Sequence, residues 1–434
     1  MADRKPPFVW MLVARAGTLV MGILASVVVA RALPPEGRGT YYMAVTVATA
    51  ALSLGHLSVE QAQTALWSEK GHRSSLDSNS VPLGLGVGTA AAVAAVGLGL
   101  LFQGHGNMPD IWLLVTACAG VPMGMGVLYG TNITLLRDRT HVAGWAMLTS
   151  AAAQCLCLIV FGVTGLLSVW TVVAAWAASY AVSLGVLTAA GGVTVRRPDL
   201  RLARATCLKG LRFHAGSAAA YLLLRSDVFL LNALAGPHDV GIYTLAVTLA
   251  EMSRLAVDVF AQVTLSLQFD DTAGDSAVVT ARIIRFMVLL GVASAVTTVV
   301  AVSAVVTPLY GRAYADTATL VAWLVPGVVL LSAGRPLSSF LLRARTSRVV
   351  VLPSLTALVV NVGLNAALIP AWGAVGCAIA STVAYTSLIA LQVAYFSRTS
   401  GIGWRCLLPT GAEATRFTTE VKRRCRQLHL GRAA

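Results

Sequence analysis

Long apolar runs follow one another along most of this chain, and each is close to the length that crosses a bilayer as a helix. Short polar turns separate most of the runs, and a longer basic stretch separates the sixth from the seventh. The pattern predicts an all-α polytopic membrane protein with about twelve transmembrane helices. The expected spans are 8–31, 40–62, 81–102, 111–135, 142–164, 168–190, 214–235, 240–264, 284–308, 317–341, 350–369 and 373–395.

The composition supports a membrane protein. Hydrophobic residues make up 57% of the chain and charged residues 12%, with a mean hydropathy of +0.76, whereas soluble domains are about a quarter charged. Small residues are abundant, and these suit helices that associate within lipid. Gly84-x-Gly86-x-Gly88 lies inside a span and follows no strand, so it favours helix packing over nucleotide binding.

Basic residues indicate the orientation of the chain. A net charge of +14 suggests nucleic acid in a soluble protein, but cytoplasmic loops of membrane proteins also collect Lys and Arg. With the N-terminus inside, 25 of the 32 basic residues fall in cytoplasmic segments, three fall outside and four lie within spans. We therefore predict a location in the cytoplasmic (inner) membrane, both termini in the cytoplasm and no nucleic-acid partner. The outer loops are too short for a catalytic domain, so an enzyme is not expected.

An internal repeat divides the chain. Segment 39–48 recurs 202 residues later as 241–250 with the same Gly-x-Tyr-x-x-Ala-Val-Thr-x-Ala spacing. Parallel repeats of this kind place a substrate site between two halves, near the middle of the membrane. We expect two pseudo-symmetric six-helix lobes around a central cavity. The predicted divisions are an N-terminal lobe at 1–190, an amphipathic cytoplasmic connector at 191–213, a C-terminal lobe at 214–395 and a basic cytoplasmic tail at 396–434.

Eight ionisable residues fall within or at the edge of the predicted spans. A charge costs roughly 2.5–3.5 kcal/mol at the centre of a bilayer, so these residues should pair, line a hydrated cavity or reach the membrane surface. Four cations meet four acids, and a strongly cationic cavity therefore does not follow from the count. The residues are Arg15, Arg225, Arg254, Arg335, Glu60, Asp227, Glu251 and Asp258.

Helical spacing sorts these charges. Glu251, Arg254 and Asp258 are three and four positions apart, so we expect Arg254 to be neutralised on its own helix. Arg225 and Asp227 lie on nearly opposite sides of their helix, and one of them should reach the next helix. Arg15 and Arg335 have no acid within helical reach.

We interpret the cations without an obvious partner as ligands of phosphate, because a guanidinium can bind a phosphate through two parallel hydrogen bonds. These predicted cavity cations are Arg15, Arg225 and Arg335. The main alternative for Arg15 is that it reaches the membrane surface, and Glu60 could simply be solvated. The remaining cavity or coupling charges are Glu60, Asp227, Glu251, Arg254 and Asp258. We expect no catalytic residue, metal site or cofactor.

Three segments resemble the signature turns of bacterial polysaccharide (lipid-linked oligosaccharide) flippases, a branch of the multidrug/oligosaccharidyl-lipid/polysaccharide exporter superfamily. They are 31–41 (Arg-Ala-Leu-Pro-Pro-Glu-Gly-Arg-Gly-Thr-Tyr), 225–243 and 361–381. Pro34-Pro35 stands where Gly-Pro is commoner, which stiffens the turn. The resemblance implies alternating access and a polyprenyl-diphosphate-linked glycan as cargo. Membrane lipids, a glycan polymerase and glycosyltransferases are the further candidate partners.

The sequence therefore favours translocation of a lipid-linked oligosaccharide or polysaccharide precursor across the cytoplasmic membrane. Two alternatives remain open. One is an ion-coupled exporter of cationic drugs or small metabolites, driven through the membrane carboxylates. The other is a scaffold of a polysaccharide assembly complex that transports nothing and would need no charges within its spans.

Overall fold

The computed structural model describes residues 7–104, 107–194, 197–264, 276–344, 348–411, 413 and 415, and the regular structure in this part of the chain is helical. The fold divides into two compact units. Unit 1 covers Met1–Thr244 and Thr307–Ala315, and unit 2 covers Leu245–Val306 and Asp316–Ala434.

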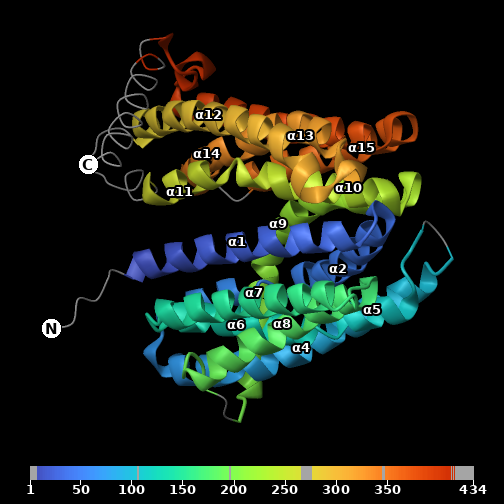
Figure 1. Ribbon diagram of the computed structural model, residues 1–434. Coiled ribbons are helices and arrows are strands. Elements are labelled where there is room, and N and C mark those ends of the chain that lie inside the picture. Colours follow the sequence, from blue (N-terminus) through green and yellow to red (C-terminus); the bar gives the residue numbers. More distant parts are fainter. Residues whose placement is uncertain are drawn as a thin grey trace, which may run out of the picture. The chain divides into compact units, whose positions relative to one another are not determined.

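Unit 1 is a layered bundle in which α1 runs beside α7, and α4 beside α6 (Figure 1). The close packing of α4 depends on glycine, because a Cβ on Gly84 would lie 2.6 Å from the Cα of Gly126, and one on Gly88 2.6 Å from the Cα of Pro122. The packing role predicted for this glycine motif is therefore confirmed at these two positions. The helices of unit 1 are α1 (Pro7–Ala32), α2 (Pro35–Gly55), α3 (Val59–Leu66), α4 (Arg73–Leu101), α5 (Ile111–Cys118), α6 (Val121–Leu136), α7 (Thr140–Val163), α8 (Val169–Ala189), α9 (Leu200–Ala235) and the start of α10 (Pro237–Met252), with the short η1 (Lys70–His72) and η3 (Arg312–Tyr314).

Side-chain caps set several helix starts in unit 1. Asp110 accepts the backbone N–H of Trp112 at the start of α5, and Ser168 forms a capping box with Thr171 at the start of α8. Asp199 caps α9 and is itself fixed to α4, because Asn79 exchanges two hydrogen bonds with its backbone at 2.7 and 2.9 Å.

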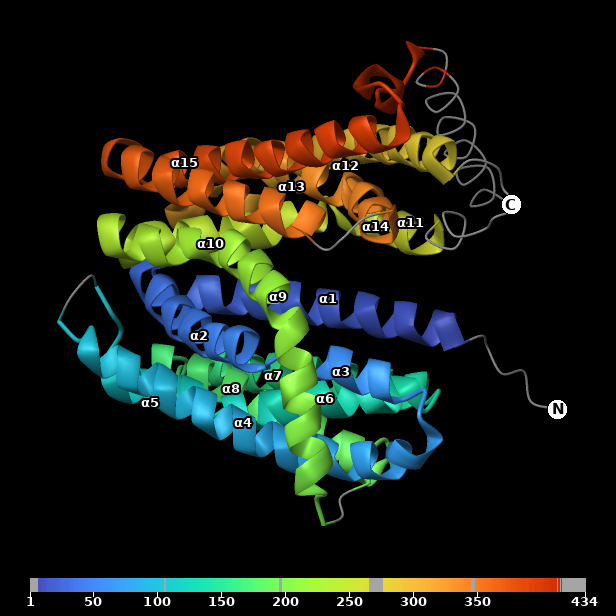
Figure 2. The same ribbon diagram turned by 180° about the vertical axis from the view of Figure 1, so that it is seen from behind.

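Helix α9 joins two segments that the sequence separates. It is 36 residues long and includes most of the predicted connector together with the predicted seventh span. Figure 2 shows α9 crossing α2 and α3, which it also contacts. This single helix therefore reaches every part of unit 1 that carries the candidate site described below.

Unit 2 contains α11 (Leu255–Thr264), most of α12 (Ser276–Tyr310), α13 (Thr317–Ala333), α14 (Arg335–Ala344), α15 (Arg348–Ser400) and η4 (Trp404–Leu407). α10 and α11 together form one predicted span, bent by 44° at residues 253–254. α13 packs along α15. Gly373 interrupts the helical geometry of α15 with φ 52° and ψ −132°, a conformation that favours glycine.

The predicted membrane spans are mostly helical within the described residues, and the one at 40–62 is interrupted at residues 56–58. Ten helices are long and apolar enough to cross a bilayer, and the bent pair α10–α11 makes eleven. α15 holds two predicted spans, 350–369 and 373–395, on either side of Gly373, which gives twelve. The chain is therefore a multi-pass membrane protein, as expected. The predicted tail is described only up to residue 411 and at 413 and 415, so most of its basic residues lie outside the described part.

Candidate functional site

Arg15 lies on α1 and is exposed. Within the described residues it makes no hydrogen bond or ion pair. An arginine in this state has its full set of donors available to an anion or to water. The structure thus leaves both sequence interpretations of Arg15 in place.

Arg225 and Asp227 extend from α9 toward different helices. The guanidinium of Arg225 donates to the hydroxyl of Tyr42 on α2 at 3.4 Å. Asp227 is buried, and its carboxylate accepts the hydroxyl of Tyr243 on α10 at 2.5 Å and the backbone N–H of Val228 at 2.8 Å. The expectation that one of these two charges reaches the next helix is confirmed for Asp227.

Unit 2 gathers three of the predicted charges around one carboxylate. Arg254 Nε lies 3.2 Å from Asp258 Oδ2, which confirms the predicted pairing along the chain for Asp258. Arg335 Nη1 lies 3.4 Å from the other oxygen of the same carboxylate. The expectation that Arg335 has no acidic partner is therefore wrong. Helical spacing cannot detect a partner on another helix, and this one comes from α11.

The other predicted carboxylates lie at helix ends. Glu251 is half-buried in the last turn of α10. Glu60 is in the first turn of α3, where its carboxylate lies 3.1 Å from His56. Arg15 and Arg225 belong to unit 1 and Arg335 to unit 2, so the convergence of the three cavity cations stays a prediction.

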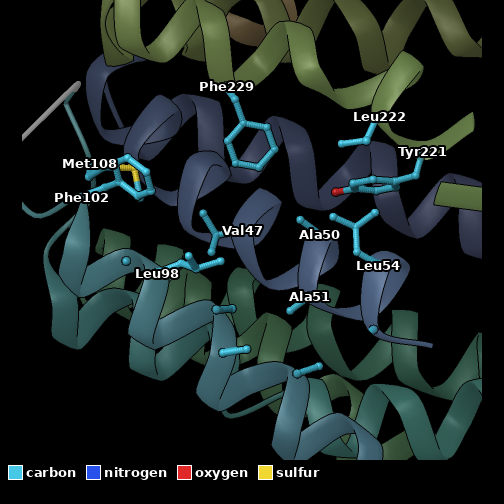
Figure 3. Close-up of a pocket in the computed structure, with 15 residues that line it drawn as sticks. Val47, Ala50, Ala51, Leu54, Leu98, Phe102, Met108, Tyr221, Leu222 and Phe229 are labelled. Carbon is cyan, nitrogen blue, oxygen red and sulfur yellow. The ribbon is translucent and has the colours of Figure 1, made fainter. Parts of the chain in front are cut away.

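An apolar pocket of about 550 Å³ lies between α2, α4 and α9 in unit 1 (Figure 3). Phe229, Leu222 and Tyr221 enter it from α9, and the hydroxyl of Tyr221 lies 3.4 Å from the hydroxyl of Thr49. A pocket of this volume is large enough for a small ligand or several links of a lipid chain. Its other lining residues are Val47, Ala50, Ala51, Leu54, Gly55, Ala91, Ala94, Ala95, Leu98, Gly99, Phe102 and Met108.

Arg225 belongs to the α9 face that lines this pocket. It is three residues after Leu222 and four before Phe229, a spacing that places the three on one side of a helix. The candidate site in unit 1 is therefore amphipathic, with an apolar pocket next to a guanidinium held by a tyrosine hydroxyl.

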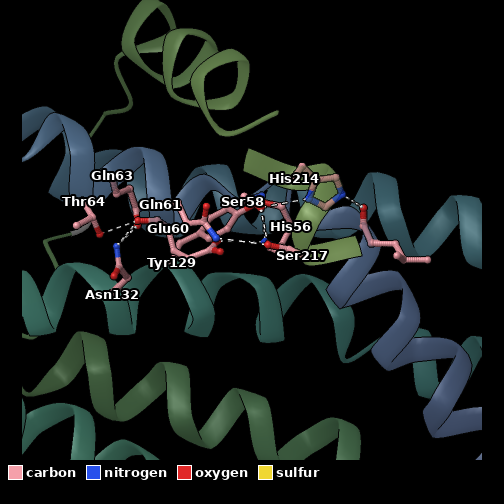
Figure 4. Close-up of polar contacts among 11 residues, drawn as sticks. His56, Ser58, Glu60, Gln61, Gln63, Thr64, Tyr129, Asn132, His214 and Ser217 are labelled. Atoms are coloured by element: carbon pink, nitrogen blue, oxygen red, sulfur yellow. Dashed lines mark hydrogen bonds and ion pairs between the residues drawn. The ribbon is translucent and has the colours of Figure 1, made fainter. Parts of the chain in front are cut away.

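A polar cluster surrounds the break between α2 and α3 (Figure 4). Tyr129 of α6 donates its hydroxyl to the backbone oxygen of His56 at 2.7 Å, and Asn132 donates to the backbone oxygen of Glu60 at 2.9 Å. His214 of α9 donates Nε2–H to the carbonyl of Leu54 at 2.9 Å. The rings of His56 and His214 meet edge to face with their centres 5.1 Å apart.

The two repeated turns, at 34–41 and 236–243, pack against each other within unit 1. A Cβ on Gly39 would lie 1.8 Å from the carbonyl oxygen of Pro237, and one on Gly241 would lie 2.0 Å from that of Pro35. These positions correspond in the repeat, so the contact is reciprocal. An exposed ion pair between Glu36 and His238, at 2.8 Å, lies beside it.

Arginines that the sequence places in the outer loops are structural in unit 1. Arg31 donates to the carbonyls of Pro308 and Leu309. Arg38 is buried, and its guanidinium lies 5.9 Å from the ring centre of Tyr314. Arg31 thus joins the end of α1 to the end of α12, and Arg38 joins the first repeated turn to η3.

Sequence reasoning missed several polar residues of unit 1. Asp77 is buried near the start of α4. Its carboxylate accepts hydrogen bonds from Arg137 Nη1 at 2.8 Å and from the backbone N–H of Thr194 at 3.0 Å. His56 and His214 were not candidates either. Two signals were available in the sequence. Histidines within apolar spans are uncommon, and His56 and Glu60 are one helical turn apart.

Comparisons with known proteins agree on the fold. A multidrug resistance MATE family transporter of the MOP superfamily in an inward-facing conformation matches with a TM-score of 0.69 at 16% identity, covering 92% of this chain and 99% of that one. The lipid II flippase MurJ in an inward closed conformation matches with a TM-score of 0.69 at 12% identity, covering 89% and 87%. A MOP superfamily transporter from Pyrococcus furiosus matches with a TM-score of 0.62 at 17% identity, covering 90% and 94%.

Comparison with curated protein sequences finds no match. The family model described as "Polysaccharide biosynthesis protein" matches residues 8–266, more than half of the sequence. The chain therefore belongs to the polysaccharide biosynthesis protein family.

Proposed function

We propose that this protein flips a polyprenyl-diphosphate-linked oligosaccharide, or a related cell-envelope precursor, from the inner to the outer leaflet of the cytoplasmic membrane. The two predicted lobes, 1–190 and 214–395, would rock against each other in alternating access. The glycan and diphosphate would occupy a central cavity while the polyprenyl chain stays in an apolar environment.

The amphipathic site in unit 1 carries this proposal. The pocket between α2, α4 and α9 is lined almost entirely by apolar side chains, and the α9 face that lines it also bears Arg225. A lipid diphosphate needs this combination. Its isoprenoid chain is stabilised by burial in an apolar pocket, and its phosphates are stabilised by charge-assisted hydrogen bonds from a guanidinium.

The state of three of the four candidate carboxylates disfavours an exporter of cationic drugs. Such an exporter needs an acid that faces its substrate. Asp227 is buried against Tyr243, Asp258 lies between two arginines, and Glu60 contacts His56. The flippase among the structural neighbours, whose name includes lipid II, adds a precedent for a lipid-linked substrate on this fold.

The direct test is flipping by the purified full chain in proteoliposomes. A fluorescent short-chain polyprenyl-diphosphate sugar is placed in both leaflets, and a membrane-impermeant quencher reports how fast the inner pool becomes accessible. We expect flipping at least about tenfold faster than in protein-free vesicles, which corresponds to about 1.4 kcal/mol in barrier. Export of a cationic dye without flipping of the lipid would favour the rival function.

The cavity cations are tested in the same assay. Arg15→Ala, Arg225→Ala and Arg335→Ala should each abolish flipping, and the Lys variants should keep part of it because they retain charge but lose the planar fork. Arg212→Ala is the matched control, because Arg212 is exposed on the same helix as Arg225. Wild-type rates in both Arg15→Ala and Arg335→Ala would exclude the phosphate-binding role.

The pocket is tested by filling it. Ala95→Phe adds a ring to the pocket wall on α4, and we expect flipping to slow by about tenfold as the space for the lipid chain closes. Val93→Phe is the control, because Val93 lies on the same helix, is 67% exposed and does not line the pocket. Equal rates for the two variants would separate the pocket from transport.

A further inference from the structure

The chain is unwound between α2 and α3, near the end of the predicted span 40–62. Leu57 and Ser58 both have a φ of 50°, a left-handed conformation that is costly for residues other than glycine. Ser58 is fully buried. A break of this kind in an apolar span exposes backbone groups that need partners, and the two histidines are among the partners here.

Two groups compete for one nitrogen of His56. The backbone N–H of Ser58 donates to His56 Nδ1 at 3.0 Å, and Glu60 Oε2 lies 3.1 Å from the same atom. A ring nitrogen has a single in-plane position, which holds either a lone pair or a hydrogen. If it holds a lone pair, an ionised Glu60 would face that lone pair with its own negative charge.

A proton between His56 and Glu60 resolves this conflict. When the proton is on Glu60, Nδ1 keeps its lone pair, and the acid O–H and the N–H of Ser58 share it. When it is on Nδ1, the ring N–H donates to the carboxylate, and the N–H of Ser58 loses its acceptor. Whether Nδ1 carries a hydrogen therefore decides whether the unwound backbone is held by His56.

The groups that face His56 and Glu60 come from α6 and α9. From α6, Tyr129 bonds the backbone of His56, and from α9, His214 approaches the ring of His56. Cys207 of α9 packs against the cluster that contains Tyr129. Within the described residues, neither His56 nor Glu60 forms an ion pair with a lysine or arginine.

The unwound backbone is also in contact with α9. The hydroxyl of Ser58 lies 3.3 Å from His214 Nδ1, which completes the polar bonds of that ring. A Cβ on Gly210 would lie 2.3 Å from the carbonyl oxygen of Leu57, so α9 rests directly on the break. Arg225 is on the same helix, eleven residues or three turns beyond His214.

We infer that His56 and Glu60 form a proton-binding site, and that loss or uptake of its proton moves the transport cycle by changing how Ser58 holds α9. The site itself is independent of the cargo. The coupling to transport rests on the proposed function, because it needs a substrate that the movement of α9 would carry.

The first experiment tests the proton site without any substrate. The seven histidines are labelled with ¹⁵N in the full chain in lipid nanodiscs, and His56 is assigned by the signal that His56→Gln removes. We expect Glu60→Gln to change the ¹⁵N signals of His56 and their response to pH, because the carboxylate that shares the proton is gone. Glu60→Asp should have the same effect, because its shorter side chain withdraws the carboxylate from His56 Nδ1.

The chain supplies a matched control for this titration. Glu36 and His238 form a similar pair at 2.8 Å, but both side chains are more than half exposed. Glu36→Gln should leave the His56 titration unchanged. If Glu60→Gln and Glu60→Asp also leave it unchanged, His56 and Glu60 do not share a proton and the inference is wrong.

The second experiment tests coupling, with the fluorescent polyprenyl-diphosphate sugar in proteoliposomes under an imposed pH gradient. The wild type and His238→Gln should change their flipping rate with the gradient. His56→Gln, Glu60→Gln and Ser58→Ala should flip at one rate with and without it. Ser58→Ala should nevertheless keep the wild-type His56 titration, because its backbone N–H remains.

The two readouts separate the possible failures. A wild type that flips the lipid but ignores the gradient would overturn the coupling and leave the proposed function intact. A wild type that flips nothing would overturn the proposed function and the coupling together. In that case the titration still decides whether the proton site exists.

Discussion

The two ends of α2 meet the segment 200–243 in different ways. At the N-terminal end, Gly39 and Gly241 each press against a backbone carbonyl of the other turn, and the ion pair beside them is exposed. At the C-terminal end, the chain unwinds at Ser58, and buried hydrogen bonds to His56 and His214 connect it to α9. One end is fixed by shape, and the other by groups that can gain or lose a proton.

This difference indicates how such a protein could confine its response to pH to one side of the membrane. In the predicted orientation the Gly39 end faces outward and the His56 end faces the cytoplasm. A contact made of backbone atoms is insensitive to pH, whereas a shared proton changes its hydrogen bonds over a narrow pH range. The same helix can then act as a fixed point at one end and a responsive one at the other.

The largest effect is expected at the fixed end. Gly39→Ala and Gly241→Ala each place a methyl group within about 2 Å of a carbonyl oxygen, so two helix starts must separate. We expect each variant to lose more stability than the roughly 1–3 kcal/mol typical of overpacking, because backbone rather than a side chain must move. Thermal unfolding in detergent measures the loss.

The control for this prediction is a glycine with open space. Gly22 on α1 and Gly86 on α4 have no atom within 4 Å of an added Cβ. Alanine at either position should leave the unfolding temperature unchanged or raise it slightly, since alanine favours a helix over glycine by about 1 kcal/mol. Equal losses at Gly39 and Gly86 would show that the reciprocal contact contributes nothing special.

A smaller effect is expected from Gly210→Ala at the responsive end. The added Cβ would lie 2.3 Å from the Leu57 carbonyl, but that carbonyl belongs to an interrupted helix whose dihedral angles can adjust. We expect a measurable loss of stability, below that of Gly241→Ala, together with a changed pH dependence of flipping. A loss larger than that of Gly241→Ala would mean that the break is the more rigid of the two ends.

Tyr129→Phe should lower the free energy of unfolding by about 1–3 kcal/mol. It removes a buried 2.7 Å hydrogen bond to the His56 carbonyl and leaves that oxygen without the hydroxyl. Chemical unfolding in detergent measures the change. Tyr180→Phe is a useful comparison, because Tyr180 is in the same unit and packs edge to face on Trp176. If both tyrosines tolerate Phe equally, the bond does not support the break.

The fold was largely predictable because a bilayer allows few solutions. Every backbone polar group in lipid must be bonded within the chain, so an apolar run of the right length becomes a helix. The division into spans 350–369 and 373–395 anticipated the break in α15, and the glycines of α4 indicated close packing. These are local properties that a single stretch of sequence contains.

The candidate site was less predictable because its partners are distant along the chain. The spacing of Arg254 and Asp258 indicated their ion pair, but nothing local revealed that Arg335 shares the same carboxylate. His56 and His214 are 158 residues apart, and they meet because α9 crosses the break after α2. The left-handed Ser58 has no sequence signature either, since serine is common in helices that lie within membranes.

The smallest effect is expected from the exposed pair at the fixed end. Glu36→Gln and His238→Gln each remove one partner of a pair whose side chains are 58% and 51% exposed. Exposed ion pairs contribute about 0–1 kcal/mol, because water screens the charges and two side chains must be held in place. Both variants should therefore unfold within about 1 kcal/mol of the wild type and flip the lipid with an unchanged response to a pH gradient. Thermal unfolding and the proteoliposome assay measure these two properties on the same preparation. A strong effect on the pH response would place a titrating group at both ends of α2, and the contrast between a fixed end and a responsive end would no longer hold.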